Sequence, residues 1–392
     1  MTTIPRFFDK PAGSFFLLGP RGTGKTWWTQ HSFPNALRLD MLDAVAFNEL
    51  AAHPEKLREK LNDRPGIKTV IIDEVQKLPE LLDEIHLIIE QKCGIQFVLT
   101  GSSARKLRRA GTNLLGGRAG RHTLHPYMAA ELGSQFNLES ALAHGLIPVI
   151  HASPAPDRAL VAYNALYLRE EIQMERLARN IGAFSRFMEA LSFSHASVLN
   201  TTNIARECAV SRTTVTGFQE ILEDLLLGYR VPVFTRRARR ELAVQPKFYF
   251  FDTGIFRANR PAGSLDRPEE IEGAALEGLV AQHLRAWCDY TASTADNHTL
   301  RYWRTRSQVE VDFVIYGKMG LYALEVKNTG KVRSEDLRGL SAFGTDYPES
   351  RRFFLYRGKE RLLRDGILIL PCEEFLRELK PGLFPFADVF AR

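Results

Sequence analysis

A glycine-rich loop near the N-terminus constrains the fold of this chain more strongly than any other sequence feature. Residues 19–26 read Gly-Pro-Arg-Gly-Thr-Gly-Lys-Thr, which has the spacing of a phosphate-binding loop. The apolar run Phe15–Leu18 before the loop is typical of a buried strand, and residues 27–30 after it are helix-forming. Glycines at such a junction let several backbone N–H groups point at one anion, which the helix N-terminus also attracts. The sequence therefore predicts a phosphate-binding loop in an α/β domain.

The loop residues are assigned to nucleotide binding, with ATP as the expected cofactor: Gly19, Pro20, Arg21, Gly22, Thr23, Gly24, Lys25 and Thr26. The Lys25 ammonium is expected to reach the outer phosphates and to act in catalysis. The Thr26 hydroxyl is expected to bind Mg²⁺, the second expected cofactor. A chance match in a glycine-rich turn is the competing interpretation, but the strand and the helix on either side argue against it.

A second apolar run ends in two carboxylates. Residues 69–72, Thr-Val-Ile-Ile, have the character of a parallel strand covered on both faces, and Asp73 and Glu74 follow. Asp73 is expected to bind Mg²⁺, directly or through water. Glu74 is expected to orient and deprotonate the water that attacks the terminal phosphate. The competing interpretation is a helix N-terminus rich in acids, since residues 78–91 read as a helix.

Two further features add to a predicted hydrolytic centre. A third strand is predicted over residues 95–99, and the Thr100 hydroxyl after it is expected to sense the terminal phosphate or to position the attacking water. Arg118 and Arg121 lie on a glycine-flanked loop, where one of them is expected to neutralise charge on the phosphoryl group during transfer. Such an arginine finger acts within one subunit or across a subunit boundary. A solvated basic loop is the alternative.

These elements, in this order, resemble those of the AAA-type ATPases. Five phrases make the chain similar to a widespread prokaryotic family of AAA ATPases with a C-terminal domain of unknown function: Gly19-Pro20-Arg21, Ile72-Asp73-Glu74-Val75-Gln76, Leu99-Thr100-Gly101-Ser102-Ser103, Gly116-Gly117-Arg118, and His125-Pro126-Tyr127 with Glu131. The resemblance covers most of the chain. The loop's Arg-Gly-Thr departs from the family's usual Arg-Gln-Val without changing the positions that carry chemistry. The resemblance implies an ATPase, and we expect a homo-oligomer, for which a ring-type assembly is one form.

Length and composition argue against several other classes of protein. The length of 392 residues predicts two or three domains. The sequence contains no run of about eighteen apolar residues, so it predicts no membrane span. Residues 1–6 lack the apolar core of a secretory signal. Cys93, Cys208, Cys288 and Cys372 form no Cys-x-x-Cys pair, which favours reduced thiols in a cytoplasmic protein over disulfides or a zinc site. A net charge of +6 permits nucleic-acid binding.

The middle of the chain has the pattern of a winged helix, in which a helix-turn-helix is followed by a strand and a wing. Residues 201–208 read as a short helix capped by Thr201 and Thr202, and a longer helix follows over residues 211–227. DNA is the expected partner, and the residues expected to contact it are Ser211, Arg212, Thr213, Thr214, Arg236, Arg237, Arg239 and Arg240. The alternatives are a module that packs or binds protein partners, and an arginine run that is solvated surface.

A second group of acidic residues lies on predicted strands near the C-terminus. Asp312 lies within the alternating run of residues 310–315, and a turn leads to residues 321–327, which include Glu325 and Lys327. We expect the two runs to be neighbouring antiparallel strands. Because side chains alternate along a strand, Glu325 and Lys327 should point to the same face.

Carboxylates beside a lysine suit metal-assisted cleavage of phosphodiesters. Asp312 and Glu325 are expected to hold one or two Mg²⁺ ions, and Lys327 to orient the attacking water or to stabilise charge. Glu277, in a helical stretch upstream, is placed to add a carboxylate. The set resembles the PD-(D/E)xK nuclease fold of restriction endonucleases and Holliday-junction resolvases, although no proline precedes Asp312. An exposed hairpin with a cross-strand ion pair and a DNA-binding scaffold that does not cleave are the alternatives.

Together these patterns predict an α/β protein of three parts. Residues 1–155 are expected to form an AAA-type P-loop ATPase domain with a parallel sheet, residues 156–245 a helical linker and winged-helix domain, and residues 246–392 a PD-(D/E)xK nuclease-like α/β domain. The leading function is Mg²⁺-dependent ATP hydrolysis coupled to binding or remodelling of DNA, branched DNA included, with cleavage left open. The alternatives are a nucleotide-driven regulatory switch that acts on protein partners, with a non-cleaving C-terminal domain, and a transcription regulator.

Overall fold

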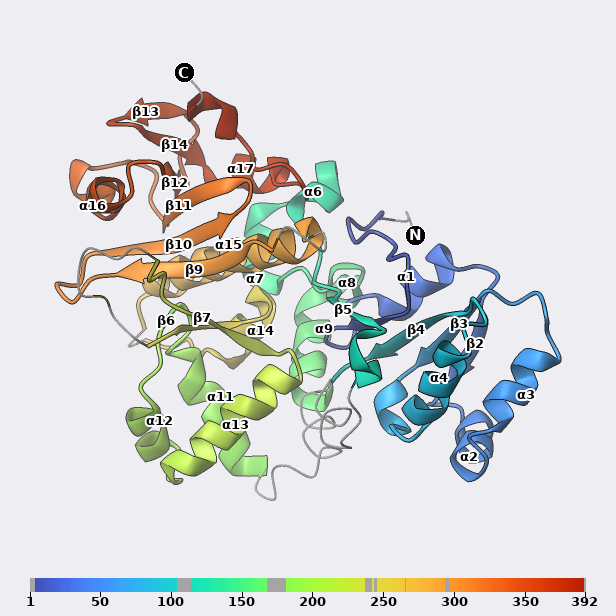
Figure 1. Ribbon diagram of the computed structural model, residues 1–392. Coiled ribbons are helices and arrows are strands. Elements are labelled where there is room, and N and C mark those ends of the chain that lie inside the picture. Colours follow the sequence, from blue (N-terminus) through green and yellow to red (C-terminus); the bar gives the residue numbers. More distant parts are fainter. Residues whose placement is uncertain are drawn as a thin grey trace. The chain divides into compact units, whose positions relative to one another are not determined.

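The computed structural model describes residues 4–103, 114–167, 181–236, 242, 245–264, 266–292 and 297–390. The chain forms two compact units, whose elements are labelled in Figure 1. The smaller unit consists of Phe8–His125 and Leu222–Leu227, and the larger unit consists of Met1–Phe7, Pro126–Ile221 and Gly228–Arg392. Along the chain, a short first segment therefore belongs to the larger unit, the next segment to the smaller unit, and the remainder to the larger unit apart from Leu222–Leu227.

A five-stranded parallel sheet forms the centre of the smaller unit, in the strand order β2-β3-β4-β1-β5. The predicted parallel sheet and its three predicted strands, now β1, β3 and β4, are confirmed. The elements of this unit are β1 (Phe15–Leu18), α1 (Lys25–Ser32), β2 (Leu37–Asp40), α2 (Ala44–Ala52), α3 (Lys56–Asn62), β3 (Thr69–Asp73), the 3-10 turn η1 (Val75–Lys77), α4 (Leu81–Glu90), β4 (Gln96–Gly101), η2 (Leu114–Gly117) and β5 (Gly120–Thr123).

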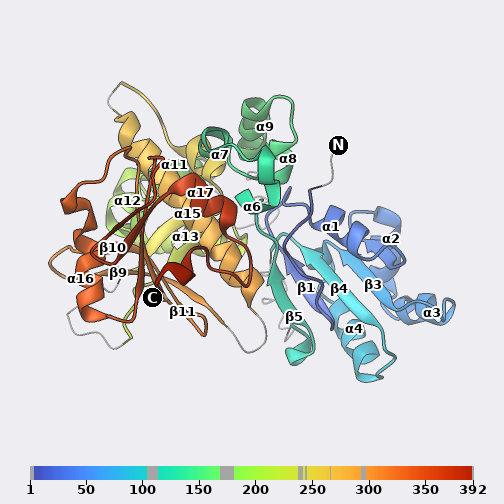
Figure 2. The same cartoon turned by 90° about the horizontal axis from the view of Figure 1, so that it is seen from above.

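Helices cover both faces of this sheet, as the alternation of side chains along β1 shows. Phe16 belongs to a hydrophobic cluster that includes Leu82 of α4, whereas the ring of Phe15 contacts the ring of Trp28 on α1. Figure 2 shows α1 and α4 on opposite sides of the strands. Every residue of β1 is buried, which is expected of a parallel strand between two helical layers.

The first part of the larger unit combines short helices with a three-stranded sheet in the order β6-β8-β7. Its elements are α6 (Ala129–Leu132), η3 (Gly133–Gln135), α7 (Leu138–His144), α8 (Pro148–His151), α9 (Pro156–Ala162), the π-helical η4 (Tyr163–Tyr167), α11 (Ile181–Ser192), β6 (Ser197–Val198), α12 (Thr201–Glu207), α13 (Arg212–Asp224), β7 (Gly228–Val231), β8 (Lys247–Phe250) and α14 (Thr253–Asn259). Figure 1 shows α11, α12 and α13 beside this small sheet.

The units divide the chain differently from the boundaries predicted at residues 155 and 245. Residues 126–155 belong to the larger unit, where Asp252 caps α14 and also accepts a hydrogen bond from Leu146 N at 2.7 Å. The second boundary falls between strands of one sheet, because β8 pairs with β6 and β7 on the other side of it. The boundary predicted at residue 155 differs from the structure because contacts between residues far apart in the chain have no local sequence pattern.

The helix pair of the predicted winged helix is present as α12 and α13. The cap of α12 is Asn200, whose side chain accepts a hydrogen bond from Asn203 N, and not Thr201 or Thr202 as predicted. Ser211 caps α13 as predicted, with its hydroxyl accepting a hydrogen bond from Thr214 N at 3.1 Å. The strand that follows the helix pair is β7.

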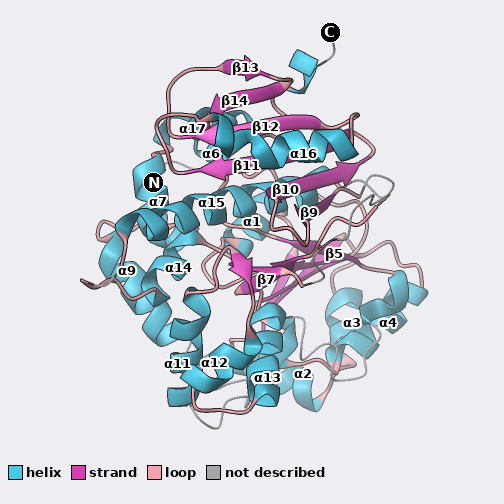
Figure 3. Ribbon diagram, turned by 90° about the vertical axis from the view of Figure 1, so that its left-hand side faces the viewer, coloured by secondary structure: helices cyan, strands magenta, loops and turns pink. Residues whose placement is uncertain are grey.

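A six-stranded mixed sheet, in the order β13-β14-β12-β11-β10-β9, forms the rest of the larger unit. Figure 3 shows α16 lying against it, and α16 shares a hydrophobic cluster with the strands. The elements are α15 (Pro268–Thr291), β9 (Thr299–Arg304), β10 (Glu310–Gly317), β11 (Gly320–Lys327), η5 (Ser334–Leu337), α16 (Arg338–Asp346), β12 (Arg351–Tyr356), β13 (Leu362–Arg364), β14 (Ile367–Pro371), α17 (Cys372–Glu378) and η6 (Ala387–Phe390). The predicted antiparallel hairpin is confirmed as β10 and β11. No helix among the described residues is both long and apolar enough to span a membrane.

Candidate functional site

The phosphate-binding loop connects β1 to α1, as the sequence predicted. Gly22 and Gly24 have φ angles of 78° and 92°, in the left-handed region that glycine enters without strain. Gly19 packs so closely that a Cβ atom there would lie 2.6 Å from the Leu124 carbonyl oxygen. The helix begins at Lys25, so its free N–H groups face the loop. The loop therefore has the backbone geometry that a bound phosphate requires.

Lys25 is folded onto the loop that it belongs to. Its ammonium donates hydrogen bonds to the carbonyl oxygens of Gly19, at 2.6 Å, and Pro20, at 3.2 Å. The Thr23 hydroxyl also donates to the Pro20 carbonyl oxygen, at 2.8 Å. Both side chains are buried. The lysine is thus held at the centre of the loop by acceptors that a nucleotide phosphate can replace.

Three predicted site residues from three elements meet at the carboxyl edge of the sheet. The Thr26 hydroxyl at the start of α1 donates to Asp73 Oδ2 at 2.8 Å, and the Thr100 hydroxyl at the end of β4 donates to Asp73 Oδ1. Oxygen atoms of hydroxyl and carboxylate groups are the ligands that Mg²⁺ prefers. The Thr26 and Asp73 oxygens, adjacent to the loop, fit an Mg²⁺ ion that accompanies a nucleotide.

Glu74 follows Asp73 in a strained backbone conformation, and a residue that the sequence did not single out fixes its side chain. Its φ of 55° lies in the left-handed region, which is uncommon for a residue with a Cβ atom. The Gln76 amide donates to the Glu74 carboxylate and to Ser102 Oγ, the latter at 3.2 Å. Gly101 admits this amide, because a Cβ atom there would lie 2.3 Å from Gln76 Oε1. The one signal for this contact in the sequence is a glutamine shortly after the two acids.

Of the two candidate finger arginines, Arg118 lies away from the phosphate-binding loop of its own chain, whereas Arg121 lies within β5. β5 runs parallel to β1 with Gly120 opposite Phe15 and Arg121 opposite Phe16. Arg118 therefore lies before the amino end of the sheet, whereas the loop follows its carboxyl end. Its guanidinium forms an ion pair with Glu90 at the end of α4.

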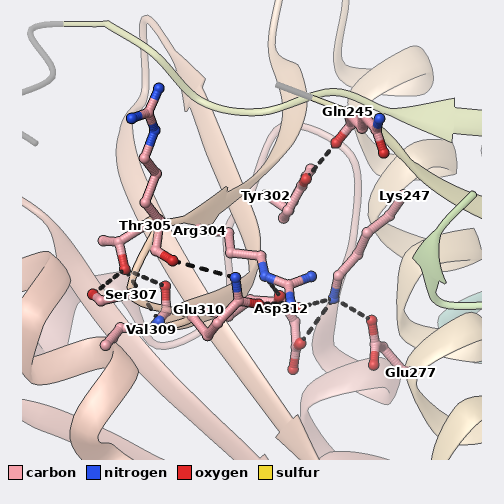
Figure 4. Close-up of polar contacts among 12 residues, drawn as sticks. Gln245, Lys247, Glu277, Tyr302, Arg304, Thr305, Ser307, Val309, Glu310 and Asp312 are labelled. Atoms are coloured by element: carbon pink, nitrogen blue, oxygen red, sulfur yellow. Dashed lines mark hydrogen bonds and ion pairs between the residues drawn. The ribbon is translucent and has the colours of Figure 1, made fainter. Parts of the chain in front are cut away.

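In the larger unit, a buried lysine joins the predicted acidic residues (Figure 4). Lys247 Nζ lies 3.0 Å from Glu277 Oε1 and 3.2 Å from Asp312 Oδ1, and it also contacts Glu310. Only 3% of the Lys247 side chain is exposed. The Tyr249 hydroxyl donates to the same Glu277 oxygen at 2.7 Å. Glu277 and Asp312 thus come together as predicted, but around a lysine that the sequence did not reveal.

The Glu-x-Lys pair lies on one face of β11, as the alternation rule predicted. Lys327 Nζ is 2.9 Å from Glu325 Oε1, and the other oxygen of Glu325 is buried without a hydrogen-bond partner in the structure. Asp312 Oδ2 accepts a hydrogen bond from Val326 N at 2.9 Å. Asp312 on β10 is therefore linked to β11 through the backbone of Val326, which lies between Glu325 and Lys327.

Burial dominates the electrostatics of this acidic group. Burial, followed by the charge of Asp312, raises the pKa of Glu277 to about 7 against the opposing effect of Lys247. Burial and then Asp312 likewise raise the pKa of Glu325. Burial by itself would lower the pKa of Lys247, but its acidic neighbours, Glu277 first among them, raise it well above its ordinary value. The lysine is therefore charged at neutral pH.

These residues do not fit the divalent metal that the predicted nuclease fold implies. Both oxygens of Asp312 already accept hydrogen bonds, one from Lys247 and one from Val326 N. Glu325 is paired with Lys327. Within the described part of the chain, no group of three or more His, Cys, Asp or Glu side chains has the arrangement to hold a metal ion. The metal role predicted for Asp312 and Glu325 therefore has no support in this geometry, because a cationic side chain lies among the acids.

The predicted DNA-contacting residues fall into two sets. Ser211, Arg212 and Thr213 are exposed at the start of α13, and Thr214 is partly buried. Arg236 is exposed as well, with its guanidinium 4.8 Å from the centre of the Tyr316 ring. Arg237, Arg239 and Arg240 lie outside the described residues.

Comparison with solved structures gives weak similarities. The replication initiator DnaA bound to AMPPCP and single-stranded DNA is 16% identical, with a TM-score of 0.28, over 54% of this chain and 82% of that one. AMPPCP-bound DnaA from Aquifex aeolicus is 15% identical, with a TM-score of 0.28, over 54% and 81%. The Pif1 helicase from Candida albicans is 15% identical, with a TM-score of 0.22, over 39% and 44%. TM-scores this low carry no argument about function.

Family models match three consecutive parts of the chain. They describe an AAA domain over residues 12–133, a domain of unknown function (DUF8612) over residues 135–266, and a domain of unknown function (DUF4143) over residues 272–375. A search of curated proteins gave no significant match. Residues 12–133, which the AAA-domain model matches, contain the phosphate-binding loop between β1 and α1 and the acidic pair after β3.

Proposed function

We propose that this chain is an Mg²⁺-dependent ATPase that works as a homo-oligomer and couples ATP hydrolysis to binding or remodelling of DNA. The observation that carries the proposal is the meeting of Thr26, Asp73 and Thr100 beside the phosphate-binding loop, with Thr26 Oγ1 2.8 Å from Asp73 Oδ2. This set of oxygens at the carboxyl edge of a parallel sheet suits phosphoryl transfer.

Each residue of the loop region has a distinct task in this proposal. The loop N–H groups and Lys25 bind the phosphates, and Lys25 exchanges its contacts with Gly19 and Pro20 for phosphate oxygens. Thr26 and Asp73 hold Mg²⁺, which supplies positive charge against the outer phosphates when bound. The Glu74 carboxylate accepts the proton of the attacking water.

The arginine finger acts between subunits in this proposal. β5 spans roughly 13 Å at the usual rise per strand residue, and Arg118 lies before its first residue, beyond the amino end of the sheet. The phosphate-binding loop of the same chain follows the opposite end. Arg118 is therefore placed to serve a neighbouring subunit's nucleotide and not its own, which supports an oligomer.

The DNA contact is assigned to α12 and α13 as part of a winged helix. Three of the predicted residues at the start of α13, Ser211 to Thr213, are exposed, which supports this role. The positive net charge of +6 permits it. We further propose that the six-stranded sheet with α15 has a PD-(D/E)xK-like fold.

A nucleotide-driven switch that acts on protein partners is the second candidate. One observation favours it: Lys247 lies among the acidic residues that a cleaving C-terminal domain would need for metal. A larger unit that binds without cutting is compatible with a DNA or a protein partner. The response of ATP turnover to DNA distinguishes the two.

The test is ATP turnover of the full-length chain with and without single-stranded, duplex and branched DNA. We expect DNA to stimulate turnover, and Arg212→Ala to reduce that stimulation while leaving turnover without DNA unchanged. Glu74→Gln should retain ATP binding and lower turnover by about 10²–10⁴-fold, because it keeps the shape of the side chain but not the base.

Two results would count against the proposal. Glu74→Gln turnover close to the unmodified value would remove the role assigned to that carboxylate. Turnover that no DNA changes, with a normal Glu74→Gln defect, would leave the ATPase in place and favour the switch on protein partners. Glu220→Ala, an exposed substitution farther along α13, is the control for the Arg212 variant.

A further inference from the structure

A single buried cation joins three acidic side chains in the larger unit. Lys247 comes from β8 of the three-stranded sheet, Glu277 from α15, and Glu310 and Asp312 from β10 of the six-stranded sheet. The lysine side chain is 3% exposed and the Asp312 side chain 7%. Figure 4 shows the lysine between Glu277 on one side and Asp312 and Glu310 on the other. The contact therefore connects three elements of this unit.

A buried ammonium group is stable only where carboxylates compensate for its lost hydration. The distances of 3.0 and 3.2 Å from Lys247 Nζ to Glu277 and Asp312 are within the range of N–H···O hydrogen bonds. Magnesium would need oxygen ligands from the same groups, at about 2.0–2.1 Å. The ammonium and a metal ion bridging Glu277 and Asp312 therefore exclude each other.

Each acid also has a second donor that holds it in its present role. Glu277 Oε1 accepts a hydrogen bond from Tyr249, and Asp312 Oδ2 accepts one from Val326 N. Glu310 Oε2 pairs with Arg304 Nε at 3.3 Å. Each of the three carboxylates therefore has two partners without a metal, and a metal that replaced those partners would break both contacts.

We infer that Lys247 is the resident cation of this cluster, a metal-free lock that joins β8 to α15 and β10 and leaves the domain without a divalent-metal site. A domain with this lock does not cleave phosphodiesters by a metal-dependent route. The lock instead ties the small sheet beside α12 and α13 to the six-stranded sheet. This inference does not depend on ATP hydrolysis by the smaller unit.

The test is titration of MnCl₂ into nucleotide-free, full-length protein by calorimetry, in an Asp73→Asn background that removes the expected metal ligand of the smaller unit. With Lys247 intact, we expect no Mn²⁺ binding that depends on Asp312. Lys247→Met should gain one bound Mn²⁺ per chain, because it frees the carboxylates, and a further Asp312→Asn should remove the gain. Lys327→Met is the matched control: it removes the lysine that pairs with Glu325 on β11 but leaves Lys247 in place, so it should gain nothing.

Two results would overturn the inference. One is Mn²⁺ binding by the background protein that Asp312→Asn abolishes, since the metal then displaces the ammonium. The other is a folded Lys247→Met protein that gains no Mn²⁺. If circular dichroism shows that Lys247→Met does not fold, the background protein and its Asp312→Asn variant are compared by thermal unfolding in EDTA and in MnCl₂. Equal Mn²⁺-induced shifts of Tm support the lock, and a larger shift with Asp312 present contradicts it.

Discussion

Gln76 illustrates how one buried side chain can decide the position of a catalytic group. Its amide nitrogen bonds both the Glu74 carboxylate and Ser102 Oγ, which ties the expected base to the end of the neighbouring strand β4. Glu74 itself has a left-handed backbone that most side chains avoid. The strained backbone and the amide contact together fix where the carboxylate points.

We expect Gln76→Leu to lower kcat for ATP hydrolysis by about tenfold or more, since a poorly positioned base loses much of its effect. The KM for ATP should change little, because the Gln76 amide bonds Glu74 and Ser102 and not the phosphate-binding loop. Steady-state kinetics measure both constants. Lys77→Ala, an exposed neighbour on the same turn, is the control. An unchanged kcat in Gln76→Leu would mean that Glu74 is positioned without the amide.

Sequence indicated which residues gather beside the glycine-rich loop, because they belong to short motifs at the ends of strands. Thr26, Asp73 and Thr100 meet as the order of strands implied. Lys247 was missed for a physical reason: a lysine at the start of an aromatic strand looks like a solvated strand end. Its burial depends on Glu277 and Asp312, which lie 30 and 65 residues away in the chain.

At the scale of elements, the long helix α15 buries a histidine in its neutral form. His283 Nδ1 donates to the Leu279 carbonyl oxygen at 2.8 Å, and its Nε2 accepts a hydrogen bond from Ala129 N at 2.9 Å. Protonation of Nε2 would set two N–H groups against each other. Burial lowers the pKa of His283 to about 4, with the Leu279 contact opposing the shift.

This histidine should make stability fall in mild acid. Because the folded pKa is below the unfolded value of about 6.5, the stabilisation is present above that pH and is lost as pH falls toward 4. His283→Gln should therefore be less stable than the unmodified chain at pH 7.5. The difference in free energy of unfolding should shrink by about 2 kcal/mol by pH 5. Denaturant unfolding at both pH values measures it, and a constant difference would contradict the neutral histidine.

The elements that sequence predicted best are those whose buried residues follow a clear apolar pattern. The strands of the parallel sheet and the β10–β11 hairpin follow from continuous or alternating apolar runs. The cap of α12 was misplaced by one residue, since Asn200, Thr201 and Thr202 are all residues that cap helices well. The two compact units differ from the predicted domain bounds, and contacts such as that between Asp252 and Leu146 have no local pattern in the sequence.

At the scale of the whole molecule, the placement of Arg118 predicts that activity depends on assembly. An Arg118→Ala protein keeps its own phosphate-binding loop, and a Lys25→Ala protein keeps its arginine. Mixing the two inactive proteins should restore part of the turnover, because some nucleotides then meet an intact loop and a neighbour's arginine. Turnover per chain should also rise with protein concentration. A concentration-independent monomer would contradict the proposal.

The control for this mixing experiment pairs Lys25→Ala with Glu74→Gln. Both proteins carry Arg118, but neither has a complete site of its own, so no arrangement of the two in an oligomer should restore turnover. Recovery in this control would show exchange or contamination and not a shared site. Recovery only in the Arg118→Ala mixture supports the finger between subunits.

The division of the chain also has a consequence for the order in which the protein is synthesised. Leu226 belongs to the hydrophobic cluster of the smaller unit, yet it is made long after His125, the last residue of that unit's main segment. The 96 residues of Pro126–Ile221 take on the order of 5–20 s to synthesise at roughly 5–20 residues per second. During that interval the nascent smaller unit lacks Leu226, so its hydrophobic cluster is complete only after that residue has been synthesised.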